Sequence, residues 1–296
     1  YVQSEYSAEN YGLIMWGHGT GWRGGYREGS VSKAFAVDDT ENTYMTNAAF
    51  GKAIEGKEFS IIGFDTCFGG VIETAYEIKD SADLMIASES IVPANGWDYY
   101  SLFTSFLETD LSEISFCNKT VTQFENQYSG DKKCTISVIN LNEIQEVKNS
   151  FDIFSLNAAS LITSTEERKS MLNVIMNQPI SFSHSSSPCN LYVDIYSLSK
   201  KLANAYNPLN STAQNLQLAL RNTVINSWSS FDTDGYNLGV YFCDLINGVA
   251  SSTHDNSYVR GSGSAQQSKF VQESTGWVPN KINSGSLLDN LFYASF

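Results

Sequence analysis

The sequence has few basic residues and no long apolar run, and each shortage excludes a class of function. It has 18 Lys and Arg against 32 Asp and Glu, a formal net charge of −14. Nucleic-acid binding depends on clustered basic side chains, so we expect no nucleic-acid partner. No stretch of about 18 consecutive apolar residues occurs, so we expect no membrane span in this chain.

Cysteine and histidine are also sparse. No CxxC pair and no histidine at zinc-ligand spacing accompanies the five cysteines, which argues against a common zinc site and against a disulfide framework. The odd count leaves at least one thiol free. Of the three histidines, His184 and His254 lie in Ser-rich stretches, and we assign them no role. The five cysteines are Cys67, Cys117, Cys134, Cys189 and Cys243.

Apolar residues make up 42% of the chain, enough for a substantial core. Two apolar runs stop abruptly at a reactive side chain flanked by glycine: residues 13–17 precede His18, and residues 60–64 lead to Cys67. Apolar runs of this length bounded by glycine predict buried strands. Parallel strands present their carboxyl ends at one rim of the sheet, so we expect His18 and Cys67 to lie at the same rim.

Strand and helix patterns alternate along the first third of the chain, which predicts parallel βαβ units in an α/β fold. No clear linker interrupts the sequence, so we expect one domain with a helical elaboration. We predict loops or irregular structure at 19–33, 178–190 and 251–284. We predict strands at 11–17, 60–64, 84–87, 134–141 and 237–242, and helices at 46–53, 70–78, 99–107, 143–156, 160–176, 193–202 and 212–227.

A thiol and an imidazole at one sheet rim are the minimum parts of a cysteine nucleophile site. The helix expected after Cys67 would favour a thiolate through its N-terminal N–H groups and dipole. The backbone N–H groups of Gly19 and Cys67 are suited to stabilise an oxyanion. Taken singly, however, Cys67 fits a buried small hydrophobe and His18 a structural strand-end residue.

The segments 14–22 and 63–67 resemble the clostripain family of cysteine peptidases, whose wider relatives are caspases, legumain, gingipains and separase. The similarity continues through 87–99, and 237–242 fits a family strand. The resemblance implies a three-layer α/β/α caspase-like fold with a mostly parallel central sheet and a helical C-terminal elaboration. Residues 1–110 would form the catalytic core, apparently without the family's upstream strands, and residues 111–296 the remainder of the same peptidase domain.

The family resemblance also implies roles for matched residues. Cys67 would attack the scissile carbonyl, and His18 would act as general acid and base in a dyad. The N–H groups of Gly19 and Cys67 would form the oxyanion hole. Asp65 matches the family's acid at the base of the specificity pocket, where a carboxylate selects Arg or Lys before the cleaved bond. The alternative for Asp65 is a strand-end residue that caps nearby N–H groups.

The loop after the third predicted strand would line the specificity pocket in this family, so Ser88, Glu89 and Trp97 are candidate substrate-binding residues. Trp97 would pack on the aliphatic stem of a Lys or Arg side chain; its alternative role is to cover the edge of the core.

Self-cleavage after a basic residue, beyond the histidine, is frequent in the family. We therefore predict cleavage after Lys33, although a basic surface loop explains the same residues. We expect no required cofactor. Calcium is a candidate ligand of the acidic turn 38–42, since calcium dependence occurs in the family, but EF-hand spacing is absent and a solvated helix cap is favoured.

We therefore predict a cysteine endopeptidase that cleaves after Arg or Lys and activates itself by loop cleavage. Its partners would be peptide or protein substrates and its own N-terminal fragment. The alternatives are an inactive binding or scaffold protein on the same fold and another hydrolase, such as an amidase, that uses Cys67. The chain begins with Tyr1 rather than Met, and the resemblance implies an exported bacterial protein that is secreted, periplasmic or lipid-anchored.

Overall fold

A computed structural model describes most of the chain as two compact units. One unit is Tyr1–Asn142 with Val224–Asp232, and the other is Glu143–Thr223 with Thr233–Phe296; each is described by itself. The residues described are 1–22, 25–27, 30–32, 35–38, 40, 43–106, 112–130, 133–176, 181–182, 192–231, 237–242, 245–246, 249–250, 268–278 and 286–292.

The first unit is built on a five-stranded sheet with the strand order β1-β6-β7-β8-β11. Its strands are β1 (Gly12–Trp16), β6 (Phe59–Asp65), β7 (Ala82–Ala87), β8 (Thr135–Asn140) and β11 (Val224–Ser229). β1, β6 and β7 are parallel neighbours, whereas β8 is antiparallel to both β7 and β11. Four of these five strands therefore point the same way, as expected for a mostly parallel sheet.

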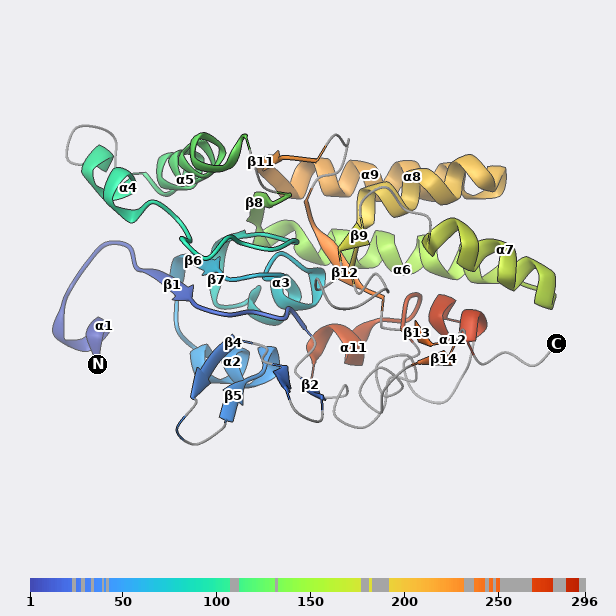
Figure 1. The fold of residues 1–296 in the computed structure, drawn as a ribbon, viewed down its shortest axis with the longest axis horizontal. Helices are drawn as coiled ribbons and strands as arrows, with labels where there is room; N and C mark the ends of the chain where they lie inside the picture. The colour runs from blue at the N-terminus through green and yellow to red at the C-terminus, as the bar shows by residue number, and fades with distance from the viewer. Residues whose placement is uncertain are drawn as a thin grey trace. The chain divides into compact units, whose positions relative to one another are not determined.

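Helices cover both faces of this sheet (Figure 1). On one face, α5 (Glu113–Tyr128) contributes Val121 and Phe124 to an apolar cluster with Ile86 and Val138 of the sheet. On the other, α2 (Asn47–Ile54) and α3 (Ile72–Ile78) contact each other, and the α2 side chain Phe50 meets the β6 side chain Phe64 edge-on. The unit thus has three layers, helix, sheet and helix.

Local sequence signals explain where several elements of the first unit begin. Thr46 caps α2 by accepting a hydrogen bond from the N–H of Ala49, as its position before an apolar pattern predicts. The predicted loop 19–33 is wrong in part, because β2 and β3 pair there as a short hairpin. The remaining elements are α1 (Val2–Glu5), β2 (Gly25–Arg27), β3 (Ser30–Ser32), β4 (Phe35–Asp38), β5 (Thr43–Met45) and α4 (Tyr99–Phe106), with η1 (Leu141–Glu143) at the boundary of the two units.

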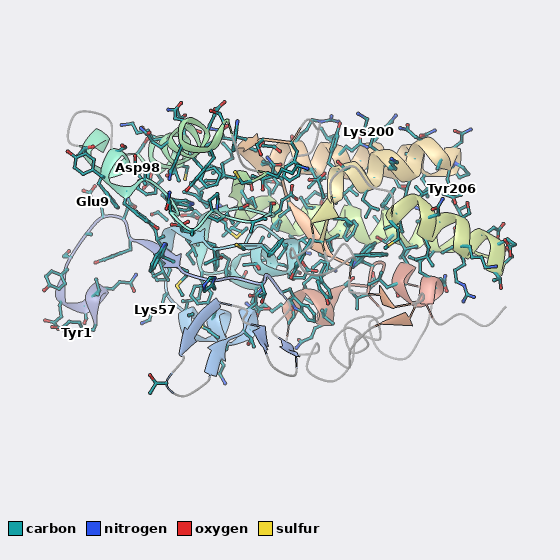
Figure 2. All side chains as sticks on the ribbon, viewed as in Figure 1. Tyr1, Glu9, Lys57, Asp98, Lys200 and Tyr206 are labelled. Atoms are coloured by element: carbon teal, nitrogen blue, oxygen red, sulfur yellow. The ribbon has the colours of Figure 1, made fainter. Side chains whose placement is uncertain are left out.

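The second unit is mainly helical. α6 (Ile144–Ser160), α8 (Ile195–Ala205) and α9 (Asn210–Thr223) form its main layer, in which α9 contacts both of the others (Figure 1). The side chain of Lys200 points away from α8 into solvent (Figure 2). The other elements are α7 (Thr165–Met176), β9 (Ser181–Phe182), β10 (Tyr192–Asp194), η2 (Asn207–Leu209), β12 (Gly239–Tyr241), β13 (Leu245–Ile246), β14 (Val249–Ala250), α11 (Lys269–Glu273) and α12 (Leu287–Phe292).

Several sequence predictions fail in this region and at its border. The helix expected over 160–176 begins only at Thr165, because α6 runs on to Ser160, and the loop expected over 178–190 contains β9. The helix expected over 193–202 starts only at Ile195, because Asp194 ends β10 and caps α8. The helix expected over 212–227 stops at Thr223, and β-branched and aromatic residues then form β11. The segment 251–284 is not wholly irregular, since it contains α11.

The strand expected at 237–242 exists, but it pairs outside the main sheet. β12 lies antiparallel to β10, which in turn pairs with β9, in a separate three-stranded sheet of the second unit. Its apolar side chains are buried there, as the apolar run predicts. The run alone could not say which sheet the strand joins, because burial is the same in either.

Candidate active site

Two adjacent parallel strands deliver the predicted nucleophile and base to one rim of the first unit. β1 and β6 pair in a register that places Trp16 opposite Asp65 at their carboxyl ends. The N–H of Gly17 donates to the carbonyl of Asp65 at 3.3 Å, so the pairing continues past β1. His18 and Cys67 each follow two residues after these paired strand ends. The predicted sharing of one sheet edge is thus confirmed.

Gly19 brings the histidine loop directly against the backbone of the nucleophile. A Cβ on Gly19 would clash with the carbonyl oxygen of Cys67 and lie 2.8 Å from the Cβ of Thr66. Only glycine permits this approach. Gly19 is buried, whereas His18 is exposed at the surface of the unit. The residue next to His18 therefore packs on the nucleophile's backbone; the catalytic role of His18 and the oxyanion role of the two N–H groups stay predictions.

Cys67 lies on a constrained turn between β6 and α3. The next residue, Phe68, has a left-handed φ of 57°, which is uncommon for a bulky side chain. The turn is held by its neighbour loop, because the N–H of Phe68 donates to the carbonyl of Ser90 at 2.8 Å. This constraint fixes the direction in which the thiol leaves the backbone.

The thiol of Cys67 is not in the electrostatic setting that the sequence predicted. α3 begins at Ile72 with Val71 as its N-cap, so Cys67 precedes the helix, as expected, and lies five residues before its first residue. Burial raises the pKa of the thiol, and the nearby charge of Asp65 raises it further, against the lowering effect of the Val92 N–H. The pKa of the thiol is thus raised, the opposite direction to the one that the sequence predicted.

Both the backbone N–H and the backbone carbonyl of Val92 contact the thiol. The N–H of Val92 donates to Sγ of Cys67 at 3.3 Å, and the thiol donates to the Val92 carbonyl oxygen, which lies 3.6 Å from Sγ. Val92 belongs to the loop 88–98, which connects β7 to α4. This loop therefore reaches both the nucleophile and, through the N–H of Trp97, the carboxylate of Asp65.

Asp65 ends β6 and is almost completely buried, with 2% of its surface exposed. Its Oδ2 accepts hydrogen bonds from the N–H of Trp97 at 3.0 Å and from the hydroxyl of Tyr99 at 2.8 Å. Its Oδ1 has no hydrogen-bond partner among the described residues. Burial raises the pKa of this carboxyl, and the two hydrogen bonds oppose the rise.

The other candidate substrate-binding residues of the loop 88–98 have buried side chains, whereas the sequence predicted that they line a pocket. The indole of Trp97 is 4% exposed and belongs to the apolar cluster under α5, so its backbone N–H, not its ring, reaches Asp65. The side chains of Ser88 and Glu89 are buried as well. In this structure these three side chains do not form an open pocket wall, and the core-covering role weighed for Trp97 is the one observed.

Two tyrosines that the sequence analysis did not single out contribute to the site. Tyr99 is the first residue of α4, whose first turn is capped by Asp98 (Figure 2) through the N–H of Ser101. Tyr128 of α5 donates its hydroxyl to the carbonyl of Gly96 at 2.7 Å. The available signal was the cluster of glycine and aromatic residues at 96–99, which indicates a constrained turn but not its contact with Asp65.

The sequence profile of the clostripain family matches residues 1–276 of the chain. The chain belongs to the clostripain family. Clostripain of Hathewaya histolytica is 31% identical over 119 residues, a match that covers 35% of this chain and 22% of clostripain. The chain thus spans less than a quarter of that curated relative.

Solved structures of the clostripain family share the fold. An inactive zymogen C11 protease from Parabacteroides distasonis is 20% identical with a TM-score of 0.59, over 81% of this chain and 66% of that one. A secreted C11 cysteine protease from Bacteroides thetaiotaomicron, solved with an irreversible peptide inhibitor, is 18% identical with a TM-score of 0.60, over 91% and 74%. The expected caspase-like α/β/α fold is confirmed.

Some predictions for this clostripain-family chain concern residues outside those described. Lys33, the candidate cleavage site, is one of them, as is most of the acidic turn 38–42. Where the structure describes side chains, no three of His, Cys, Asp or Glu gather into a metal-binding group. Among the same residues, no helix has the length and apolar character needed to cross a bilayer.

Proposed function

We propose that this chain is a cysteine endopeptidase that cleaves after Lys or Arg by means of Cys67 and His18. The observation that carries the proposal is that the loops after β1 and β6 meet at one sheet rim. Gly19 packs there on the carbonyl of Cys67, and β6, the strand that leads to Cys67, ends at the buried carboxyl of Asp65. Family membership supports the same chemistry.

The reaction follows from the positions of the two groups. The sulfur of Cys67 attacks the scissile carbonyl carbon while His18 accepts the thiol proton. The C–N bond then breaks, and His18 returns the proton to the departing amine, which leaves a thioester. Water hydrolyses the thioester, releases the acid and restores the thiol.

The raised pKa of Cys67 makes proton removal by His18 part of the attack. The sulfur must also leave its contact with Val92 before it reaches a substrate. We propose that the part of the loop 88–98 around Val92 moves when a peptide binds.

The specificity follows from Asp65. A buried carboxyl with an unpartnered oxygen is costly, and a substrate cation offers the missing partner. We further propose that self-cleavage after Lys33 precedes activity, that activity requires no cofactor, and that the protein is exported. The inactive zymogen and the secreted relative among the solved structures support processing and export.

The test uses four fluorogenic peptides that differ only in Lys, Arg, Ala or Glu before the scissile bond. The wild type should cleave the Lys and Arg peptides, and Cys67→Ala and His18→Ala should each lower kcat/KM by at least about 10³-fold. Iodoacetamide labelling, mapped by mass spectrometry, should modify Cys67 ahead of the buried Cys117.

Other outcomes separate the alternatives. Cleavage of small amides but of no peptide would identify an amidase, and the absence of hydrolysis and of Cys67 labelling would identify a binding protein. Unchanged fragment sizes in Lys33→Ala would contradict self-cleavage at that residue. Cleavage of only the Ala or Glu peptide would overturn the role of Asp65 and keep the dyad.

A further inference from the structure

We propose that the Asp65 pocket prefers lysine to arginine before the scissile bond, and that the hydroxyl of Tyr99 sets this preference. The inference rests on the proposed function, since it concerns the substrate of the same pocket. It follows from how many hydrogen-bond positions of the carboxylate the protein itself occupies.

The two oxygens of Asp65 are not equally available. A carboxylate oxygen accepts about two hydrogen bonds. Oδ2 already accepts two, from the N–H of Trp97 at 3.0 Å and from the hydroxyl of Tyr99 at 2.8 Å. Oδ1 accepts none among the described residues. The carboxylate therefore keeps one buried oxygen whose hydrogen-bonding capacity the described residues leave unused.

The backbone of the loop also closes over the occupied oxygen. Gly96 has a left-handed φ of 61°, and a Cβ built on it would lie 2.5 Å from Oδ2 of Asp65 but 3.1 Å from Oδ1. The loop is held there from α5, because Tyr128 donates to the carbonyl of Gly96. While the Tyr99 hydroxyl is bound, a second donor from a substrate thus finds no further position at Oδ2.

Lysine and arginine differ in how many oxygens they need. An ammonium group is a compact charge with three donors, and it binds well to a single carboxylate oxygen. A guanidinium group gains most from a paired, fork-like contact with both oxygens of a carboxylate. With Oδ2 occupied, arginine loses one of these two contacts, whereas lysine loses none.

The ring of Tyr99 is fixed, so its hydroxyl is a lasting partner of Oδ2. The ring lies 6.3 Å from the ring of Trp97 and stacks at 6.3 Å on that of Phe103, with an angle of 15° between the two planes. Replacement by phenylalanine keeps these contacts and removes only the hydroxyl. Tyr99 is therefore a positioning residue whose effect is separable from packing.

The experiment compares kcat/KM for the matched Lys and Arg peptides in wild type, Tyr99→Phe, Tyr128→Phe and Tyr100→Phe. The wild type should favour the Lys peptide by about tenfold, the usual effect of one charge-assisted hydrogen bond. Tyr99→Phe should bring the ratio close to one. Tyr128→Phe should lower both values and keep the ratio, and Tyr100→Phe, whose side chain is 80% exposed, should change neither.

The possible failures are distinguishable. Equal or faster cleavage of the Arg peptide by the wild type overturns the preference, even if the Tyr99 variant does not fold. A Tyr99→Phe ratio equal to that of the wild type, or equal shifts in the Tyr99 and Tyr128 variants, overturns the role of the hydroxyl. Cleavage of neither peptide by the wild type overturns the proposed function and this inference together.

Discussion

Two buried aspartates, Asp65 of the first unit and Asp152 of the second, have opposite surroundings. In the second unit, Asp152 pairs with Lys148 at 3.0 Å through one oxygen. Its other oxygen accepts from the hydroxyl of Ser274 and the N–H of Gly276, both at 2.8 Å. In the first unit, Asp65 has no cation beside it among the described residues, and one of its oxygens has no partner.

This difference separates a structural carboxylate from one suited to bind a ligand. A buried carboxylate with a counter-ion on one oxygen and hydrogen bonds on the other holds chain segments together, and Asp152 ties α6 to the segment 274–277. A buried carboxyl without these partners adds a cost to the folded state. Asp65 carries that cost at the rim beside Cys67, where a cationic substrate would remove it.

Asp65→Asn should have the largest effect, and it should fall on activity. The amide keeps the shape of the side chain and an oxygen for Trp97, but it removes the charge that a Lys or Arg side chain needs. We expect kcat/KM for the Lys peptide to fall about 10³-fold, equivalent to about 4 kcal/mol of transition-state binding. The urea midpoint should be no lower than that of the wild type.

The matched measurement for Asp65→Asn is cleavage of the Ala peptide, which should change little because no cation enters the pocket. Full activity of the variant on the Lys peptide would show that Asp65 is a structural cap, the alternative weighed from the sequence. A loss of stability without loss of activity would show that Asp65 is a structural carboxylate, as Asp152 is, and that the two do not differ in role.

Asp152→Asn should have the next largest effect, and it should fall on stability. It leaves the buried ammonium of Lys148 without a counter-charge, although that group still donates to the carbonyl of Glu273. We expect the free energy of unfolding to fall by about 3 kcal/mol, measured by urea denaturation followed by circular dichroism.

The control for Asp152→Asn is Asp80→Asn, which breaks the exposed ion pair with Lys79 at 2.8 Å. The change there should stay below about 0.5 kcal/mol, because solvent screens an exposed pair. Equal effects of the two substitutions would show that burial does not distinguish these pairs.

The sequence identified the parts of the molecule that depend on local patterns. The apolar runs before His18 and Cys67 form β1 and β6, and Thr46 caps the helix that its position predicts. The common rim followed from the parallel direction of the two strands. These features depend on neighbours in the chain or on a general rule of sheet topology, so sequence suffices for them.

The features that the sequence missed depend on contacts between distant segments. Tyr99 reaches Asp65 across 34 residues, and Gly276 reaches Asp152 across 124. Neither pair has a sequence signal, since each partner is an ordinary residue in its own segment. The prediction about the surroundings of the Cys67 thiol was wrong for a related reason. The start of α3 at Ile72 and the burial of Cys67 both depend on how the loop 88–98 folds over the turn between β6 and α3.

A third buried aspartate, Asp194, tests whether a carboxyl whose burial is not fully offset by hydrogen bonds lowers the free energy of unfolding. It caps α8 through the N–H of Ser197 at 2.7 Å, and burial raises its pKa from 3.8 to about 6 against hydrogen bonds from Ser197, Asn237 and Leu238. Between these pKa values the folded state binds more protons than the unfolded state, so the free energy of unfolding falls as pH rises. The shift of about two units corresponds to at most about 3 kcal/mol.

Asp194→Asn keeps an oxygen for the cap and removes the titration. Between about pH 4 and about pH 7, the wild type should lose about 2 kcal/mol more stability than the variant, because only its Asp194 must ionise in the core. Urea denaturation of both proteins at the two pH values measures this difference, in which the other titrating groups cancel. Parallel pH profiles would mean that the burial of Asp194 is offset as fully as that of Asp152. Of the three aspartates, only Asp65, at the rim beside Cys67, would then have an unsatisfied carboxyl.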